Sequence, residues 1–256
     1  MANGNGSAVA PMRAIVIGAS TTGLIAAAAL SRHFAQVTVL ERDTLPAEPE
    51  WRKGVPQSRH VHLLLRCGEE VISEYFPGVT DELVAAGGRR VDMAADTRWF
   101  YAGGWKARFD SGITMYCQSK GFLEWTLRRR VENLPNAIVR DKAEIDTYLV
   151  SDGAVCGVRL KTGEEVTADL VVDASGRNSK TPQRLAALGF GEVEVSELPV
   201  DVGYATRAYR IPPGKRDWLS LIVHPRYPDS RLGVIIPVEG DRWLVTLVGS
   251  RGDHPP

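Results

Sequence analysis

The chain has 256 residues, 44% hydrophobic and 24% charged, the balance of a globular protein that can bury a sizeable core. Its 31 basic and 31 acidic residues cancel, so no overall field favours nucleic acid or an anionic membrane. The longest apolar run, LIAAAAL, is far shorter than the ~20 residues of a membrane span. Three scattered cysteines form no CxxC pair, which disfavours a disulfide framework and favours a cytoplasmic location.

Residues 1–12 are rich in Gly, Asn and Ser and lack the basic and apolar segments of a signal peptide, so they predict a disordered tail. The next stretch predicts a βαβ unit, with a strand at 13–17, an Ala/Leu-rich helix at 22–34 and a second strand from Gln36. The loop GASTTG joins the first strand to the helix, and Glu41 closes the second strand.

This glycine loop predicts a dinucleotide site. Gly18 permits a tight turn, Gly23 lets the helix pack closely, and a pyrophosphate would rest on the helix N-terminus. Ser20 replaces the usual middle glycine, which costs room but adds a hydroxyl donor. Glu41 stands where an acid accepts from a ribose hydroxyl, which favours FAD or NAD over NADP. The alternative is a tight turn that binds nothing.

Further along, a helix is expected at 62–76, antiparallel strands up to Cys117, and an amphipathic helix at 120–134. A β-meander then leads into the strand DLVVD, and longer alternating strands follow Pro182. The fold class is therefore α/β, a Rossmann-like βαβ unit with a parallel sheet and β-meander, interleaved with an antiparallel-sheet domain. We expect 13–76 and 118–185 to form the nucleotide-binding domain, and 77–117 and 186–256 the substrate-binding sheet domain.

The stretch DLVVDASGRNSKTPQRL resembles the second flavin-binding motif of the class A FAD-dependent monooxygenases, the para-hydroxybenzoate hydroxylase group. RKGVPQSRHVHLLL, YCQSKGFLEWTLRRRV and GVIIPVEGDRWLVTLVG are similar to segments of its epoxidase-like branch, which includes the polyether epoxidases. The resemblance covers residues 13–256 and selects FAD as the dinucleotide. A serine within the glycine loop is common in this branch.

The resemblance implies how each cofactor-binding residue acts. The loop residues Gly18, Ser20 and Gly23 would cradle the pyrophosphate, and Glu41, followed by Arg42, would hold the adenosine ribose. Arg59 would meet an FAD phosphate or ribose, and Lys120 would contact FAD from a helix start where the branch usually has arginine. The second motif would contribute Asp173 and Gly176.

By resemblance, the chain is expected to be an FAD-dependent monooxygenase that hydroxylates or epoxidises an apolar small molecule of secondary metabolism. NAD(P)H would reduce the flavin, O₂ would add to give a C4a-hydroperoxide, and one oxygen would pass to the substrate. The cofactor carries this chemistry, so no catalytic side chain is named. The family's third flavin motif, a GD-containing stretch, does not appear before the chain ends at GSRGDHPP. That favours an N-terminal fragment over a short relative, and leaves two alternatives, a non-redox cyclase and a prenyl-chain reductase.

Three other patterns make weaker predictions. His60 and His62 lack a third ligand and diverge on a helix, so no metal site is expected. By resemblance, His60 would lie near the flavin beside Arg59; the alternative is a histidine that is packed or exposed. The run 128–130 is three arginines, which we expect on a solvated face rather than against nucleic acid. Four aromatic residues line an apolar pocket or form the core of a small sheet: Trp99, Phe100, Tyr101 and Trp105.

Overall fold

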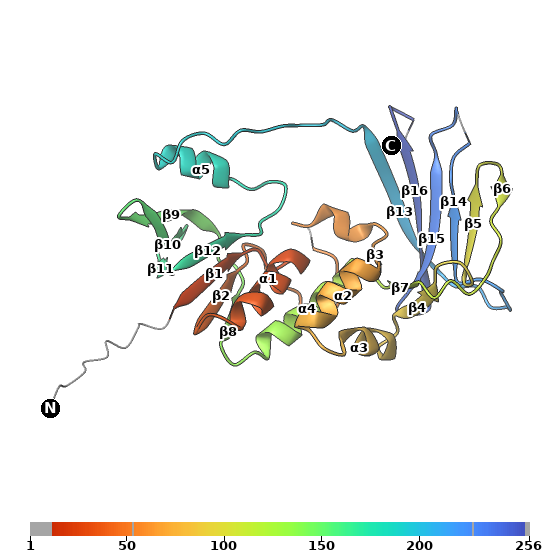
Figure 1. Ribbon diagram of the computed structural model, residues 1–256, viewed down its shortest axis with the longest axis horizontal. Coiled ribbons are helices and arrows are strands. Elements are labelled where there is room, and N and C mark those ends of the chain that lie inside the picture. Colours follow the sequence, from red (N-terminus) through yellow and green to blue (C-terminus); the bar gives the residue numbers. More distant parts are fainter. Residues whose placement is uncertain (1–11, 53, 227, 254–256) are drawn as a thin grey trace. The chain divides into compact units, whose positions relative to one another are not determined.

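The computed structural model describes residues 12–52, 54–226 and 228–253, so the expected disordered tail lies almost entirely outside the described residues. The chain divides into two compact units (Figure 1). Unit 1 comprises Met1–Leu45 and Arg128–Glu194, and unit 2 comprises Pro46–Leu127 and Val195–Pro256. Residues 46–76 and 118–127, expected in the nucleotide-binding domain, are grouped with the antiparallel sheet. Which unit binds which ligand stays a prediction.

Unit 1 contains a four-stranded parallel sheet in the order β12-β1-β2-β8. The four strands are β1 (Arg13–Ile17), β2 (Gln36–Leu40), β8 (Ala137–Arg140) and β12 (Leu170–Asp173). A three-stranded meander accompanies it, made of β9 (Ile145–Ser151), β10 (Ala154–Leu160) and β11 (Glu165–Thr167). The helices are α1 (Thr21–Ser31) and α5 (Thr181–Ala187), and α4 (Lys120–Glu132) runs from unit 2 into unit 1.

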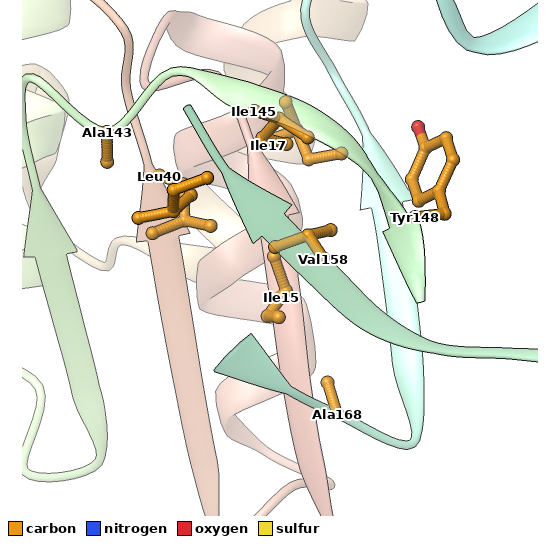
Figure 2. Packing of buried hydrophobic residues seen from close by; sticks show 9 residues of the cluster. Ile15, Ile17, Leu40, Ala143, Ile145, Tyr148, Val158 and Ala168 are labelled. Atoms are coloured by element: carbon orange, nitrogen blue, oxygen red, sulfur yellow. The ribbon is translucent and has the colours of Figure 1, made fainter. Parts of the chain in front are cut away.

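Strand β1 is buried on both faces, as its continuous apolar sequence predicts for the middle of a parallel sheet. Ile15 and Ile17 pack with Leu40 against the meander, where Ile145 and Val158 belong to the same buried cluster (Figure 2). The α1 helix contacts the sheet through its small residues instead. Each buried Ile or Leu side chain contributes about 1.5–3 kcal/mol. This packing anchors β1, so the loop that follows it starts at the carboxyl edge of the sheet.

Unit 2 is built on a six-stranded sheet in the order β13-β16-β15-β14-β5-β6, antiparallel except where β14 runs parallel to β5. Its strands are β5 (Thr97–Tyr101), β6 (Gly104–Trp105), β13 (Val202–Arg210), β14 (Ser220–Val223), β15 (Leu232–Val238) and β16 (Arg242–Ser250). A small sheet contains β3 (Leu63–Leu64), β7 (Thr114–Cys117) and β4 (Arg89–Asp92). The remaining elements are the short 3₁₀ helix η1 (Pro56–Arg59), α2 (Arg66–Tyr75) and α3 (Val79–Ala85).

The two sheets of unit 2 share one apolar core. Met115 and Cys117 of the small sheet are buried in the same cluster as Ile236, Val238 and Leu244 of the large sheet. The expected α/β class, with a parallel sheet, a β-meander and an antiparallel sheet, is confirmed. No helix among the described residues is long and apolar enough to cross a membrane. The three cysteines are free thiols.

The helix expected at 62–76 begins later than the sequence suggests. Leu63 and Leu64 form β3 and pair with Cys117 and Tyr116, so α2 starts only at Arg66. The apolar run VHLLL fits a helix face and a buried strand equally well. Pairing with a strand more than fifty residues away decides between them, and local sequence carries no trace of that partner.

Candidate functional site

The glycine loop of unit 1 has no room for side chains at two positions. Gly18 has φ +99°, and a Cβ there would lie 2.7 Å from the Ala174 carbonyl oxygen. A Cβ on Gly23 would lie 1.8 Å from the Gly18 carbonyl oxygen. The Gly18 N–H donates to the Leu40 carbonyl at 2.8 Å, which ties the turn to β2. The loop therefore presents its backbone closely at the head of α1, as phosphate binding requires.

Ser20 is the N-cap residue of α1, with extended backbone angles of φ −88° and ψ 178°. Its side chain makes no capping hydrogen bond to the helix, and the first turn carries no acidic residue. The first N–H groups of a helix lack intrahelical acceptors and carry the positive end of the helix dipole. No carboxylate in that turn competes with an anionic ligand, so this end suits a pyrophosphate.

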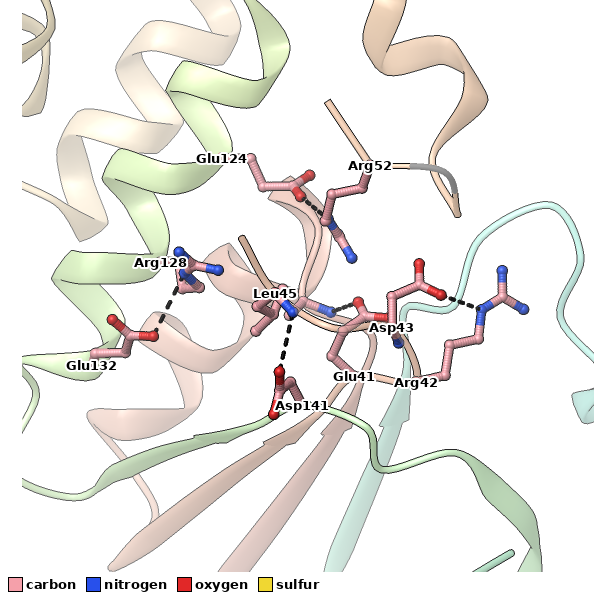
Figure 3. A network of polar contacts seen from close by, with 10 residues as sticks. Glu41, Arg42, Asp43, Leu45, Arg52, Glu124, Arg128, Glu132 and Asp141 are labelled. Atoms are coloured by element: carbon pink, nitrogen blue, oxygen red, sulfur yellow. Dashed lines mark hydrogen bonds and ion pairs between the residues drawn. The ribbon is translucent and has the colours of Figure 1, made fainter. Parts of the chain in front are cut away.

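Glu41 lies beneath the same loop with 6% of its surface exposed. Its Oε2 accepts from the Ala19 N–H at 2.9 Å, and its Oε1 accepts from the Asp43 N–H at 3.0 Å. Figure 3 shows Glu41 beside Arg42 and Asp43. Each carboxylate oxygen can accept a second hydrogen bond, so a ribose hydroxyl can still be bound. Arg42 is about half exposed, and its Nε lies 3.8 Å from Asp43 Oδ1.

The second predicted motif follows β12 directly beside β1, where Asp173 is the register partner of Ile17. Its Oδ1 accepts from the Ser175 N–H at 2.8 Å, and its Oδ2 accepts from the hydroxyls of Ser179 and Thr181. Partial burial raises the pKa of Asp173, but these hydrogen bonds outweigh it and hold the pKa below its usual value. The carboxylate thus shapes the loop that packs against Gly18.

Seven predicted cofactor residues therefore lie at the carboxyl edge of one parallel sheet. They come from the ends of β1, β2 and β12, which is where nucleotides bind in open α/β sheets. Gly176 has φ +84° and open space around it, so its loop can approach a ligand closely. Sequence reasoning missed Ser179 and Thr181, although both stand in the quoted motif.

Arg59 and Lys120 belong to unit 2. Arg59 ends η1, is exposed, and places its guanidinium carbon 3.5 Å above the Trp51 ring. Lys120 begins α4 and is half-buried. Burial is the largest effect on the pKa of Lys120 and lowers it. The Glu124 carboxylate raises this pKa and the Arg52 guanidinium lowers it, and the net shift is downward.

Close to Lys120 lies a buried ion pair that the sequence alone does not predict. Arg52 Nε and Glu124 Oε1 are 2.6 Å apart, with side chains 5% and 10% exposed (Figure 3). A Cβ on Gly121 would lie 2.4 Å from the Glu50 carbonyl oxygen, so the segment before Arg52 packs directly on α4. The Oε1 of Gln118 is buried without a hydrogen-bond partner among the described residues, which leaves an acceptor available to a ligand donor.

The three weaker sequence patterns have different outcomes in the structure. No group of three metal-ligating side chains occurs among the described residues. Arg128 is 7% exposed and lies 3.5 Å from Glu132, so the solvated face expected at 128–130 is wrong for this arginine. The four aromatic residues lie on the β5–β6 hairpin, where Tyr101 and Trp105 are 54% and 55% exposed. Trp99 and Phe100 are half-buried, so a sheet core is wrong only for Tyr101 and Trp105.

Comparison with known proteins adds to this geometry. A family model described as an FAD binding domain matches residues 12–251. Protein Rv3254 of Mycobacterium tuberculosis is 34% identical over an alignment that covers 95% of this chain and 54% of that protein. The chain thus spans about half the length of this relative.

Solved structures of similar fold share less sequence. PqsL, a probable FAD-dependent monooxygenase from Pseudomonas aeruginosa, is 17% identical with a TM-score of 0.72, over 94% of this chain and 61% of PqsL. 2-Methyl-3-hydroxypyridine-5-carboxylic acid oxygenase is 18% identical with a TM-score of 0.66, over 95% of this chain and 60% of the oxygenase.

Proposed function

Because this chain belongs to the FAD-binding-domain family, we propose that it is the FAD- and substrate-binding part of an FAD-dependent monooxygenase. Its substrate is an apolar small molecule, hydroxylated or epoxidised with O₂, and NAD(P)H is the reductant. The observation that carries the proposal is the meeting of the glycine loop, Glu41 and the Asp173 loop at one sheet edge.

The residues of unit 1 fit FAD in a definite way. The loop from Gly18 and the first turn of α1 bind the pyrophosphate through backbone N–H groups and the Ser20 hydroxyl. Glu41 accepts from the adenosine ribose while it keeps its bond from Ala19. Asp173 holds the second loop against Gly18, so both loops are preorganised before the cofactor arrives. FAD, when bound, supplies the electron transfer and the oxygen chemistry.

The sheet of unit 2 offers an apolar surface for the substrate. Leu221, Ile235 and Val245 are cross-strand neighbours in three adjacent strands and share one face. All three are only partly buried, and Leu247 on the same face is 54% exposed. Such a row excludes water from an apolar ligand lying on it. It supports a hydrophobic substrate more than a charged one.

The first experiment is FAD binding by the purified chain. Flavin released by denaturation is quantified, and apoprotein is titrated with FAD and with FMN, which lacks the pyrophosphate and adenosine. We expect FAD to bind at least tenfold more tightly than FMN, because the unit 1 contacts recognise the part that FMN lacks. Glu41→Gln should weaken FAD about tenfold and leave FMN unchanged, whereas Glu192→Gln, an exposed carboxylate of the same unit, should change neither. Equal affinity for FAD and FMN would overturn the proposed site.

The second experiment tests the reaction class on flavin-loaded protein. NAD(P)H oxidation that requires O₂ supports a monooxygenase. NAD(P)H oxidation that proceeds without O₂ when a prenyl-chain alkene is added, with the alkene reduced by the electrons, supports the prenyl-chain reductase instead. A protein that binds flavin but oxidises no NAD(P)H under any condition supports the non-redox cyclase.

A further inference from the structure

The β5–β6 hairpin and the residues that follow it, together residues 97–109, form one end of the large sheet in unit 2 and are called the aromatic hairpin below (Figure 1). All residues from 101 to 110 are exposed, and three of them carry large aromatic side chains: Tyr101, Trp105 and Phe109. Single exposed apolar side chains are normal on protein surfaces, but a cluster of them marks an interaction surface. The aromatic hairpin therefore calls for a partner.

Aromatic rings lie on both faces of this hairpin. Phe100 and Trp105 are cross-strand partners on one face, with ring centroids 5.3 Å apart. Trp99 and Tyr101 flank Phe100 in β5, and successive strand residues point to opposite faces, so these two rings lie on the other face. A protein partner with a flat surface would cover one face and leave the other in water. Rings on both faces instead favour a medium that surrounds the hairpin, such as the interfacial region of a lipid bilayer.

A cation accompanies the rings on each face. The Arg98 guanidinium carbon lies 5.1 Å from the Trp105 ring centroid, and the Lys106 ammonium nitrogen lies 4.8 Å from that of Trp99. Both cations are exposed, and neither forms an ion pair within the part of the chain that the structure describes. A cation–π contact leaves the positive charge in place. Both side chains can therefore still attract the phosphates of lipid headgroups.

We propose that the aromatic hairpin docks unit 2 on an anionic lipid surface, with its rings at headgroup depth and Arg98 and Lys106 against the lipid phosphates. Trp and Tyr concentrate at membrane–water interfaces because each ring combines an apolar body with a polar group, and Lys and Arg near the surface are attracted to anionic lipids. The chain as a whole has no net charge, but residues 97–109 contain three basic residues and no acidic one. The third of these, Arg108, is paired with Asp217. An apolar substrate dissolves in bilayers, so docking would bring the protein to it.

Docking is measured by co-sedimentation of the full chain with vesicles, either of phosphatidylcholine alone or of equal parts phosphatidylcholine and phosphatidylglycerol. We expect binding to the anionic vesicles that weakens at high salt, because salt screens exposed charges. Lys106→Gln and Arg98→Gln should each lower the partition coefficient about fivefold. Lys215→Gln, which changes an exposed lysine elsewhere in unit 2, should leave it unchanged. No binding to either vesicle, or equal binding to both, would overturn the proposal.

Insertion of the hairpin itself is read from tryptophan fluorescence with anionic vesicles that contain brominated lipid, which quenches tryptophans at the bilayer. Trp105→Phe keeps an apolar ring, so this variant should still bind, but most of the quenching should disappear. Trp51 is the matched control, since it is 52% exposed and also lies beneath an arginine, and Trp51→Phe should keep the quenching.

Two results would assign the hairpin differently. Quenching that persists in full in Trp105→Phe would place the lipid contact elsewhere and overturn the proposal. Self-association in lipid-free solution that Trp105→Ala abolishes, measured by light scattering, would make the hairpin an interface between two copies of the chain and would also overturn it. These measurements need no flavin, so a negative result leaves the proposed function standing.

Discussion

Replacing Glu124 by glutamine isolates the cost of an unpaired buried charge. Glutamine keeps the shape of the side chain but removes the charge that balances Arg52, 2.6 Å away and almost fully buried. Removing one partner of a buried ion pair costs about 3–5 kcal/mol. At about 2–4 °C per kcal/mol for a chain of this size, the unfolding midpoint should fall by roughly 6–20 °C.

The chain contains a matched control for this substitution. Arg66 and Glu70 form the same atom pair, Nε to Oε1, at 2.9 Å, but their side chains are 69% and 57% exposed. Glu70→Gln should therefore change stability by less than about 1 kcal/mol. The double substitution Arg52→Met with Glu124→Leu removes both charges and should recover most of the loss, because apolar side chains need no partner.

The assay is thermal and urea-induced unfolding of the full chain, followed by circular dichroism. The buried and exposed pairs have nearly the same separation, so a difference between Glu124→Gln and Glu70→Gln reports burial alone. The reasoning is refuted if Glu124→Gln destabilises the protein no more than Glu70→Gln does. It is also refuted if the double variant is as unstable as the single one.

Three further predictions concern single groups. Gly23→Ala places a Cβ 1.8 Å from the Gly18 carbonyl oxygen, so FAD titration should show no binding, whereas Gly68 in α2 meets only a flexible leucine and should tolerate alanine. Burial raises the pKa of Cys117 to about 12, outweighing a hydrogen bond to Ser220, so DTNB at pH 8 should modify exposed Cys67 and reach Cys117 only after unfolding. Because that pKa is raised on folding, the stabilisation is complete below pH 9 and is lost as the pH rises towards 12. The pKa of Asp173 is instead lowered, so its stabilisation is present above about pH 4 and is lost in acid; Asp173→Asn should flatten the acid unfolding curve measured by circular dichroism.

Much of unit 1 could be predicted because its signals are local. The strand 13–17, the glycine loop and Glu41 form one continuous stretch, and the meaning of each residue depends on its neighbours in sequence. The glycine positions are required by backbone contacts that the motif spacing already implies. The carboxyl-edge location of Asp173 also follows from a hydrophobic strand that ends at an acid, since parallel strands end at the same edge.

Contacts between distant segments could not be predicted from the sequence. Arg52 and Glu124 are 72 positions apart, and each alone is typical of an exposed charge. The hydrogen bond between the His60 ring and the Thr206 hydroxyl spans 146 positions, and threonine in a strand carries no sign of a polar partner. The run 128–130 predicts a solvated face, because the three side chains point in different directions on a helix and the neutral chain gives no field for nucleic acid, yet Arg128 lies on the buried side of α4. Helical periodicity beside Leu127 is the signal that could have indicated this.

The arrangement of the parallel sheet has a consequence for synthesis of the chain on the ribosome. The first strand, β1, lies between β2 and β12, and Arg13 is hydrogen-bonded to a residue 156 positions later. The ribosome adds about 5–20 residues per second, so one edge of this apolar strand stays unpaired for roughly 8–30 s until β12 has been translated. During that interval β1 and β2 present an unpaired hydrophobic edge, the kind of surface that other nascent chains can join. Slower translation through unit 2 should therefore increase aggregation, and chaperones that shield β1 should matter most before residue 170 has emerged.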